Sequence, residues 1–248
     1  MSLLLLWSAV DLLGTERIQF QSGTNRTALI ELYTSEGCSS CPPAEQWLSK
    51  LKADPRLWVD FVPAAFHVDY WDYLGWRDPF GATAYSDRQR AYAAGWKARS
   101  VYTPGFVLDG KEWRGWSSRD GMPRPSNDVV GMLSLNSGDA KVWSLRFEPG
   151  NHRPGESYVF HVALLGFDLT SDVKSGENRG RKLRHDFVVL TTAQAEASRS
   201  HDGVHSMISL PISLKIEHAR IGIACWVTRG QDLEPIQAVG GWLPMANR

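Results

Sequence analysis

Two cysteines three positions apart, Cys38 and Cys41, lie between two strong secondary-structure signals near the start of the chain. Residues 27–34 are rich in aliphatic, β-branched and aromatic side chains, which predicts a strand. Residues 44–52 carry apolar side chains at helical spacing, which predicts a helix. Residues 59–68 are nearly continuous in apolar side chains, as expected for a strand that is covered on both faces. The cysteines therefore sit at the strand-to-helix junction of a predicted strand–helix–strand unit.

Three further elements are predicted before residue 138 from the same kinds of signal. They are a helix over residues 82–98, a hairpin over residues 106–116 and a short helix over residues 126–135. Asp109-Gly110 is a strong turn dipeptide for the hairpin, and Ser126 or Asn127 would cap the last helix.

The pattern changes after residue 138. Alternating apolar and polar side chains now predict strands at short spacing, with turn residues between them. The predicted strands cover residues 143–147, 158–164, 183–191, 204–214, 219–228 and 235–243. This spacing favours an all-β, sandwich-like unit. We therefore predict an N-terminal segment over residues 1–26, an α/β domain over residues 27–138 and a β-rich domain over residues 139–248.

The two cysteines predict redox chemistry. A CxxC motif that follows a strand and opens a helix in a strand–helix–strand unit is typical of a thioredoxin-like redox site. Backbone N–H groups near the helix start favour a thiolate at the first cysteine, and the second sulfur is close enough to resolve a mixed disulfide. Because Pro42 and Pro43 offer no N–H group to Cys41, we expect Cys38 to be the more accessible and more acidic thiol. The prediction is an α/β thioredoxin-like domain in which Cys38 attacks and Cys41 resolves.

Other functions use the same motif. The pair could be half of a structural zinc site, but a second close pair is missing, so Cys225 or scattered histidines would have to complete it. It could also handle a soft metal such as Cu(I). A third alternative is a binding module, in which the thiols are inert and the β-rich domain recognises the partner. Cys225 lies in an apolar run and is predicted to be a small core residue.

Three stretches carry a resemblance to a known family. They are ELYTSEGCSSCPPA at residues 31–44, FHVDYWDYLGWRDPF at residues 66–80 and YTPG at residues 102–105. Together they resemble a bacterial family of thioredoxin-like proteins of unknown function, often labelled secreted, over residues 27–243. The resemblance implies a thioredoxin-like N-terminal domain and a β-rich C-terminal domain, without a characterised reaction.

The resemblance also adds residues to the site. Thioredoxin-like proteins place a cis-proline beside the CxxC motif, where the preceding backbone pairs with substrate, and the order of elements matches Thr103 and Pro104 to that place. Glu31, a lone acid in an apolar strand, is costly to bury unpaired. The resemblance implies that Glu31 takes the proton of Cys41, and the alternative is an edge-facing or salt-bridged glutamate.

His67, Tyr70 and Trp71 are predicted to line the substrate site. Sites in open α/β sheets gather at the carboxyl ends of strands, which places His67 on the same rim as Cys38. His67 could stabilise a thiolate, move protons, hold a metal together with Asp69, or simply be a hydrogen-bonded histidine. Tyr70 and Trp71 begin an aromatic run that offers either a substrate platform or packing.

Charge and hydropathy exclude other classes. The 27 Lys and Arg residues balance the 27 Asp and Glu residues, so net charge does not favour a nucleic-acid partner. The basic stretch 177–185 is predicted to be a solvated loop, with partner binding as the alternative. No apolar run approaches the roughly 20 residues of a membrane-spanning helix. The predicted partner is a protein or small-molecule thiol or disulfide, with no organic cofactor and no metal.

The start of the chain leaves the compartment open. Residues 1–13 include a run of leucines like the apolar core of a secretory signal, but a basic segment does not precede it. The resemblance favours a periplasmic or secreted protein, whereas an N-terminus that is not a signal would favour the cytoplasm.

Overall fold

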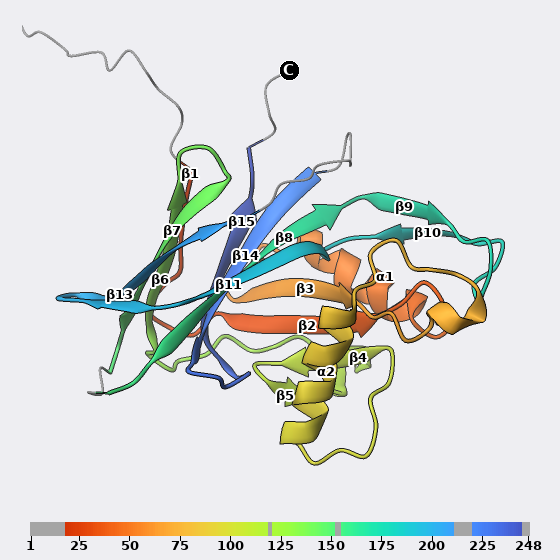
Figure 1. The fold of residues 1–248 in the computed structure, drawn as a ribbon, viewed down its shortest axis with the longest axis horizontal. Helices are drawn as coiled ribbons and strands as arrows, with labels where there is room; N and C mark the ends of the chain where they lie inside the picture. Colours follow the sequence, from red (N-terminus) through yellow and green to blue (C-terminus); the bar gives the residue numbers. More distant parts are fainter. Residues whose placement is uncertain (1–17, 119–120, 152–154, 211–219, 245–248) are drawn as a thin grey trace, which may run out of the picture.

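The computed structural model describes residues 18–118, 121–151, 155–210 and 220–244, and strands dominate it (Figure 1). The largest sheet has eight strands in the order β15-β14-β8-β11-β3-β2-β4-β5. Its members are β2 (Ala28–Thr34), β3 (Phe61–His67), β4 (Gly105–Leu108), β5 (Lys111–Glu112), β8 (Tyr158–Phe167), β11 (Val188–Glu196), β14 (Arg220–Arg229) and β15 (Pro235–Trp242). Within this sheet β3 pairs in parallel with β2 and β11, and the other pairs are antiparallel.

Two smaller sheets complete the described strands. A five-stranded sheet has the order β1-β6-β7-β13-β12, and a two-stranded sheet pairs β9 with β10. Their bounds are β1 (Ile18–Gln21), β6 (Gly131–Ser137), β7 (Val142–Pro149), β9 (Leu169–Asp172), β10 (Lys182–His185), β12 (Ser198–Ser200) and β13 (Gly203–Ser209). Buried side chains of β6, β7 and β13 share a core with those of β8, β14 and β15, so the five-stranded sheet packs on that half of the large sheet.

Two α-helices flank the other half of the large sheet. They are α1 (Pro42–Lys50) and α2 (Thr83–Gly95), and short 3-10 helices cover Leu51–Ala53, Asp72–Leu74 and Gly115–Ser117. Thr34 of β2 is hydrogen-bonded to Glu45 of α1, whereas Tyr33 packs edge-on against Tyr92 of α2. Because successive side chains of a strand point to opposite faces, the two helices cover opposite faces of β2.

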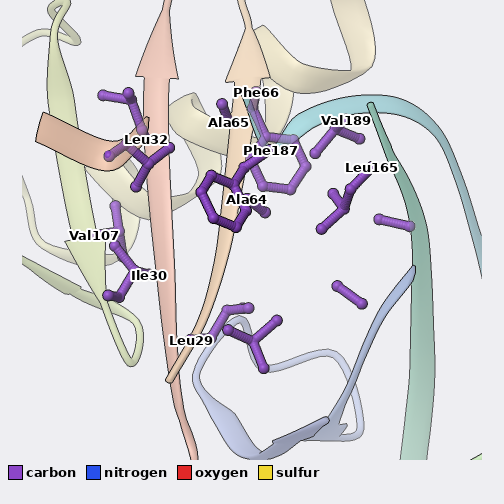
Figure 2. Packing of buried hydrophobic residues seen from close by; sticks show 14 of the residues in the cluster. Leu29, Ile30, Leu32, Ala64, Ala65, Phe66, Val107, Leu165, Phe187 and Val189 are labelled. Carbon is purple, nitrogen blue, oxygen red and sulfur yellow. The ribbon is translucent and has the colours of Figure 1, made fainter. Parts of the chain in front are cut away.

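The first core surrounds β2 and β3 (Figure 2). Leu29, Ile30 and Leu32 from β2 are fully buried. Ala64 and Phe66 from β3 have an exposed fraction of 1% or less. Helices, or strands from the second half of the chain, cover both faces here, which explains why the two strands are nearly continuous in apolar residues. The predicted strand–helix–strand unit is confirmed, and so are α2 and the β4–β5 hairpin.

The predicted fold class is wrong. The chain does not form an α/β thioredoxin-like domain followed by an all-β, sandwich-like domain. Instead β2 and β3 belong to a mixed eight-stranded sheet, in which β11 lies beside β3 with Val188 opposite Ala65. Strands from both sides of residue 138 therefore share one sheet. The local patterns identified the strands, but they contain no information on which distant strand fills the free edge of β3.

Two local predictions also fail. Residues 126–135 do not form a helix capped by Ser126 or Asn127, because β6 begins at Gly131 and its side chains alternate between buried and half-buried. Residues 183–191 form two strands, β10 and β11, rather than one. Most of the predicted strand 204–214 is β13, but residues 211–214 lie outside the described residues, as do residues 1–13 with the suggested signal. In the described part of the chain, no helix combines the length and the apolar character needed to cross a membrane.

Candidate active site

The CxxC motif forms the turn that joins β2 to α1. Cys41 is the N-cap of the helix, which begins at Pro42, where the fixed φ of proline suits a first turn. The backbone N–H of Cys41 donates to the carbonyl oxygen of Cys38 at 3.2 Å, which closes the turn. Both cysteines are free thiols and both are fully buried. The expected greater exposure of Cys38 is therefore not observed, and the two thiols differ instead in their hydrogen bonds.

Hydrogen bonds converge on the sulfur of Cys38. The Ser40 hydroxyl lies 3.3 Å from it, the Cys38 thiol donates to the carbonyl oxygen of Thr103 at 3.8 Å, and the Cys41 thiol is a further hydrogen-bond partner. The bond from Cys41 contributes most to lowering the pKa of Cys38 to about 6, against the opposing effect of burial. Burial, followed by the contact with Cys38, raises the pKa of Cys41 well above its usual range. The site therefore holds one acidic thiol and one thiol that keeps its proton.

Thr103, Pro104 and Trp71 lie beside this turn. The Thr103–Pro104 peptide bond is cis, as expected. The Trp71 indole N–H donates to the Thr103 hydroxyl at 2.8 Å. A Cβ on Gly37 would lie only 2.8 Å from Cβ of Trp71, so the tryptophan packs directly on the backbone before Cys38.

Tyr70 supports the same segment indirectly. Its hydroxyl donates to the side-chain oxygen of Gln89 at 3.1 Å, and the Gln89 amide donates to the carbonyl oxygen of Tyr102 at 2.7 Å. Burial raises the pKa of the Tyr70 hydroxyl above its usual range. Tyr70 thus braces the segment that leads into Thr103.

Glu31 lies in a different cluster. Its carboxylate accepts two hydrogen bonds from the Arg88 guanidinium, at 2.8 and 2.9 Å, and one each from the Tyr33 and Tyr92 hydroxyls. None of these bonds involves a cysteine. Of the two interpretations, the salt-bridged glutamate describes its surroundings, because Glu31 points to the α2 face of β2 while α1 and the CxxC turn lie toward the other.

Two residues from the second half of the chain clasp the CxxC turn, and sequence reasoning missed both. The Asn178 side-chain amide donates to the carbonyl oxygens of Glu36 and Cys38, at 2.8 and 2.9 Å. Glu177 accepts hydrogen bonds from the backbone N–H and the hydroxyl of Ser39, at 2.9 and 2.7 Å. The basic side chains of residues 177–185 are exposed, as predicted for a solvated loop, but the stretch ends in β10, and Asn178 and His185 are buried. No local signal relates this segment to a motif some 140 residues earlier.

A buried ionisable cluster lies next to the turn. His185 of β10 bridges two carboxylates, with Nδ1 2.5 Å from Glu45 and Nε2 3.0 Å from Glu36. Burial lowers the pKa of His185, but the carboxylates of Glu45 and Glu36 outweigh it and raise the pKa to about 10. Burial likewise opposes ionisation of Glu45, yet His185 holds its pKa below the usual range. The Thr34 hydroxyl donates to the other oxygen of Glu45 at 2.5 Å.

His67 extends this cluster from the end of β3. It is fully buried, and its Nδ1 lies 2.8 Å from the carboxylate of Asp78. The Asp78 carboxylate also accepts from the backbone N–H groups of Glu36 and Phe80. Asp69, the predicted partner, instead accepts from the hydroxyls of helix α2 residues. The structure therefore brings His67 near the CxxC turn, as predicted. It lies inside the buried cluster, however, and not on a surface that a substrate could contact.

A cavity of about 510 Å³ lies elsewhere, between α2 and strands β8, β11 and β14. Arg88, His161 and Trp226 are among its lining residues, and no cysteine is. Burial lowers the pKa of His161 to about 3, which keeps this histidine neutral. The cavity does not belong to the thiol site. Cys225 is fully buried in the second core, as predicted.

Comparisons with known proteins place the chain in a family. A search of the curated proteins found no match. A solved structure of a protein from Agrobacterium tumefaciens is 25% identical, covers 88% of this chain and 94% of that one, and has a TM-score of 0.61. The structure of HBP35 of Porphyromonas gingivalis is similar in fold, with 12% identity, coverage of 92% and 79%, and a TM-score of 0.57. The family model described as a protein of unknown function, DUF1223, matches residues 29–228. That match spans most of the chain and includes Cys38, Cys41 and His185. The chain therefore belongs to the DUF1223 family.

Proposed function

We propose that Cys38 and Cys41 form a dithiol that exchanges with a disulfide or thiol of a protein or small-molecule partner. The observation that carries this proposal is the pair of free thiols on one turn, where Cys41 and the Ser40 hydroxyl lower the pKa of Cys38 while burial keeps Cys41 protonated. A thiolate is the attacking species in thiol–disulfide exchange, and a neighbouring thiol is needed to release the partner.

The exchange follows from this asymmetry. The Cys38 thiolate attacks one sulfur of the partner disulfide, forms a mixed disulfide and releases the other partner sulfur as a thiolate, which takes a proton from water. Cys41 then attacks the Cys38 sulfur and its proton passes to the second departing partner sulfur. The partner gains two electrons and two protons in total, and the chain is left with a Cys38–Cys41 disulfide. The reverse sequence oxidises a partner dithiol.

The burial of Cys38 adds a condition to this chemistry. Ser39 and Ser40 are exposed, but the sulfur beneath them is covered, and the bonds from Ser39 to Glu177 hold the turn in place. A partner disulfide reaches the Cys38 sulfur only after the groups that cover it move, and the hydrogen bonds of Glu177 and Asn178 to the turn restrain that movement. The carbonyl oxygen of Thr103 lies 3.8 Å from the Cys38 sulfur and is available to a partner bound there.

The test measures exchange directly. The full chain is equilibrated in glutathione buffers of graded potential, and mass spectrometry follows the loss of two hydrogens as the disulfide forms. We expect a reversible two-electron transition in the wild type, and a mixed disulfide with glutathione at Cys38 in Cys41→Ser. Cys225→Ser is the matched control, because Cys225 is a buried cysteine outside the site. A pair that stays reduced across the series, or a Cys41→Ser variant that forms no mixed disulfide, contradicts the proposal and favours the inert binding module.

A further inference from the structure

We propose that Glu45, His67 and His185 bind a divalent transition-metal ion of the Zn²⁺ class in the buried cluster beside the CxxC turn. Each of these residues offers one ligand atom, and the three atoms lie within 4.8 Å of one another. Two imidazoles and one carboxylate are a common donor set for zinc and for other first-row divalent metals. The proposal uses neither cysteine and stands independently of thiol exchange.

The orientation of His67 is the first argument. Its Nδ1 is committed to Asp78, and its Nε2 is a buried nitrogen that has no hydrogen-bond partner among the described residues. An unpaired polar atom in a fully buried position costs free energy unless a ligand satisfies it. We assign Nε2 as the ligand atom of His67, because its other ring nitrogen is already bonded to Asp78.

The partners behind the two histidines are the second argument. His67 is held by Asp78 through Nδ1, and His185 is held by Glu36 through Nε2. A carboxylate on the non-ligating nitrogen of a metal-bound histidine fixes its tautomer and its ring orientation. Here both histidines have such a carboxylate. The remaining nitrogen of His185, Nδ1, faces Glu45, so metal would replace the proton that these two groups share.

The charge of the cluster is the third argument. Glu36, Glu45 and Asp78 are three buried carboxylates. Within the described residues no lysine or arginine forms an ion pair with any of them, and their charged or chargeable partners are the two histidines. Buried carboxylates are stable when they are paired or when they coordinate a metal. A divalent cation bound by Glu45, His67 and His185 would place two positive charges among these three carboxylates.

The shape of the site sets what kind of metal site it is. Bonds of about 2.0–2.2 Å in a tetrahedral arrangement hold ligand atoms roughly 3.3–3.6 Å apart. In this structure the three atoms lie within 4.8 Å of one another, and Nδ1 of His185 is only 2.5 Å from the Glu45 carboxylate, so a bound metal requires side-chain shifts in which this pair moves apart. Phe80 packs its ring against both imidazoles, at centroid distances of 5.3 and 5.6 Å, and shields them from water. A metal bound here would tie α1, β3 and β10 together behind the CxxC turn, and its three protein ligands leave a fourth coordination position for water.

The experiment measures metal per chain in the full-length protein. The chain is stripped with a chelator, dialysed against Zn²⁺ and analysed by plasma mass spectrometry, and the same preparation is loaded with Co²⁺ for visible spectroscopy. We expect one tightly bound ion per chain and a cobalt spectrum with d–d bands but no thiolate-to-cobalt charge-transfer band. Asp78→Asn, which alters only the residue behind His67, should weaken binding by about 10- to 100-fold.

Two variants separate this site from its competitors. The double variant Cys38→Ser/Cys41→Ser should keep its ion, whereas His67→Gln should lose it. His161→Gln is the matched control, since His161 is also buried but lies in the other cavity. Loss of zinc from the double cysteine variant, a thiolate band in the cobalt spectrum, or wild-type protein without a stoichiometric ion would overturn the proposal. If His67→Gln does not fold, the wild-type cobalt spectrum and the double cysteine variant still decide the matter.

Discussion

Asn178 donates a hydrogen bond of 2.9 Å from its side-chain amide to the backbone carbonyl oxygen of Cys38, 140 residues earlier in the chain. The same amide group donates to the carbonyl oxygen of Glu36, and the asparagine is fully buried. The amide satisfies both carbonyl oxygens in a buried position, where water cannot replace it as a donor. Loss of either hydrogen bond therefore costs free energy, and the two bonds hold the backbone between Glu36 and Cys38 in place. These two bonds tie the CxxC turn to the second half of the chain.

Replacing Asn178 with alanine should loosen the CxxC turn. The two carbonyl oxygens lose their donor, so we expect the free energy of unfolding to fall by about 1–3 kcal/mol. The Cys38 thiol should also react faster with a maleimide under native conditions. Urea denaturation measures the first effect and stopped-flow labelling measures the second. Asn151→Ala, at an exposed position, is the control and should change neither. An unchanged labelling rate would show that the clasp does not limit access to the thiol.

The identity of residue 41 should set the acidity of Cys38. The Cys41 thiol provides the largest contribution to the lowered pKa of Cys38. Serine at this position retains a hydrogen-bond donor, whereas alanine removes it. In Cys41→Ser the pH midpoint of iodoacetamide labelling should stay near 6, and in Cys41→Ala it should move toward about 8.5, the ordinary value for cysteine. Labelling rates between pH 4 and pH 10 measure both midpoints. Equal midpoints in the two variants would show that another group stabilises the thiolate.

Glu31→Gln should affect stability and leave the thiols unchanged. Glu31 and Arg88 form a buried ion pair, and removal of one partner leaves the other charge uncompensated. We expect a loss of about 3–5 kcal/mol in the free energy of unfolding. The pH profile of cysteine labelling should match that of the wild type at a temperature where the variant is folded. A shift in the labelling of Cys41 would instead support Glu31 as its proton acceptor.

Asp109 should make the protein less stable as the pH rises from 4 to 7. Burial raises the pKa of this carboxyl to about 6, although the backbone N–H of Leu29 and the charges of Arg26 and Lys111 oppose the shift. Because the folded-state pKa is above the unfolded value of about 3.9, the stability contribution is complete below pH 4 and is lost through pH 6. Asp109→Asn should remove roughly 1–3 kcal/mol of this pH dependence.

Asparagine suits this position because residue 109 has a positive φ of 47°, which asparagine tolerates better than most residues. The measurement is the difference in unfolding free energy between pH 4 and pH 7, compared between variant and wild type. Asp87→Asn, at an exposed carboxylate, is the control. The same pH dependence in Asp109→Asn and wild type would refute the assignment.

Local elements were predictable where the signal depends on neighbouring residues. The strand before Cys38, the helix after Cys41 and the turn at Asp109-Gly110 all follow from side-chain spacing and turn chemistry, and the structure has each of them. Residues 126–135 show the limit of this approach. A capping residue predicted a helix there, but the alternation of Met132, Ser134 and Asn136 with buried residues makes a strand, because a partner strand was available to pair with it.

The sequence by itself determined the chemistry available at the turn: two thiols three positions apart, two serines between them and two prolines after them. Tertiary structure alone decided the environment of those thiols. The pairing of β3 with β11, the hydrogen bonds of Asn178 to the CxxC turn and the meeting of His185 with Glu45 and His67 join residues more than 100 positions apart. Whether such contacts form depends on the free energy of folding the whole chain, to which residues far apart in the sequence contribute together. Periodicity and spacing describe residues that are close together in the sequence. They could therefore place the cysteines at a strand-to-helix turn, but they could not reveal which distant residues surround them.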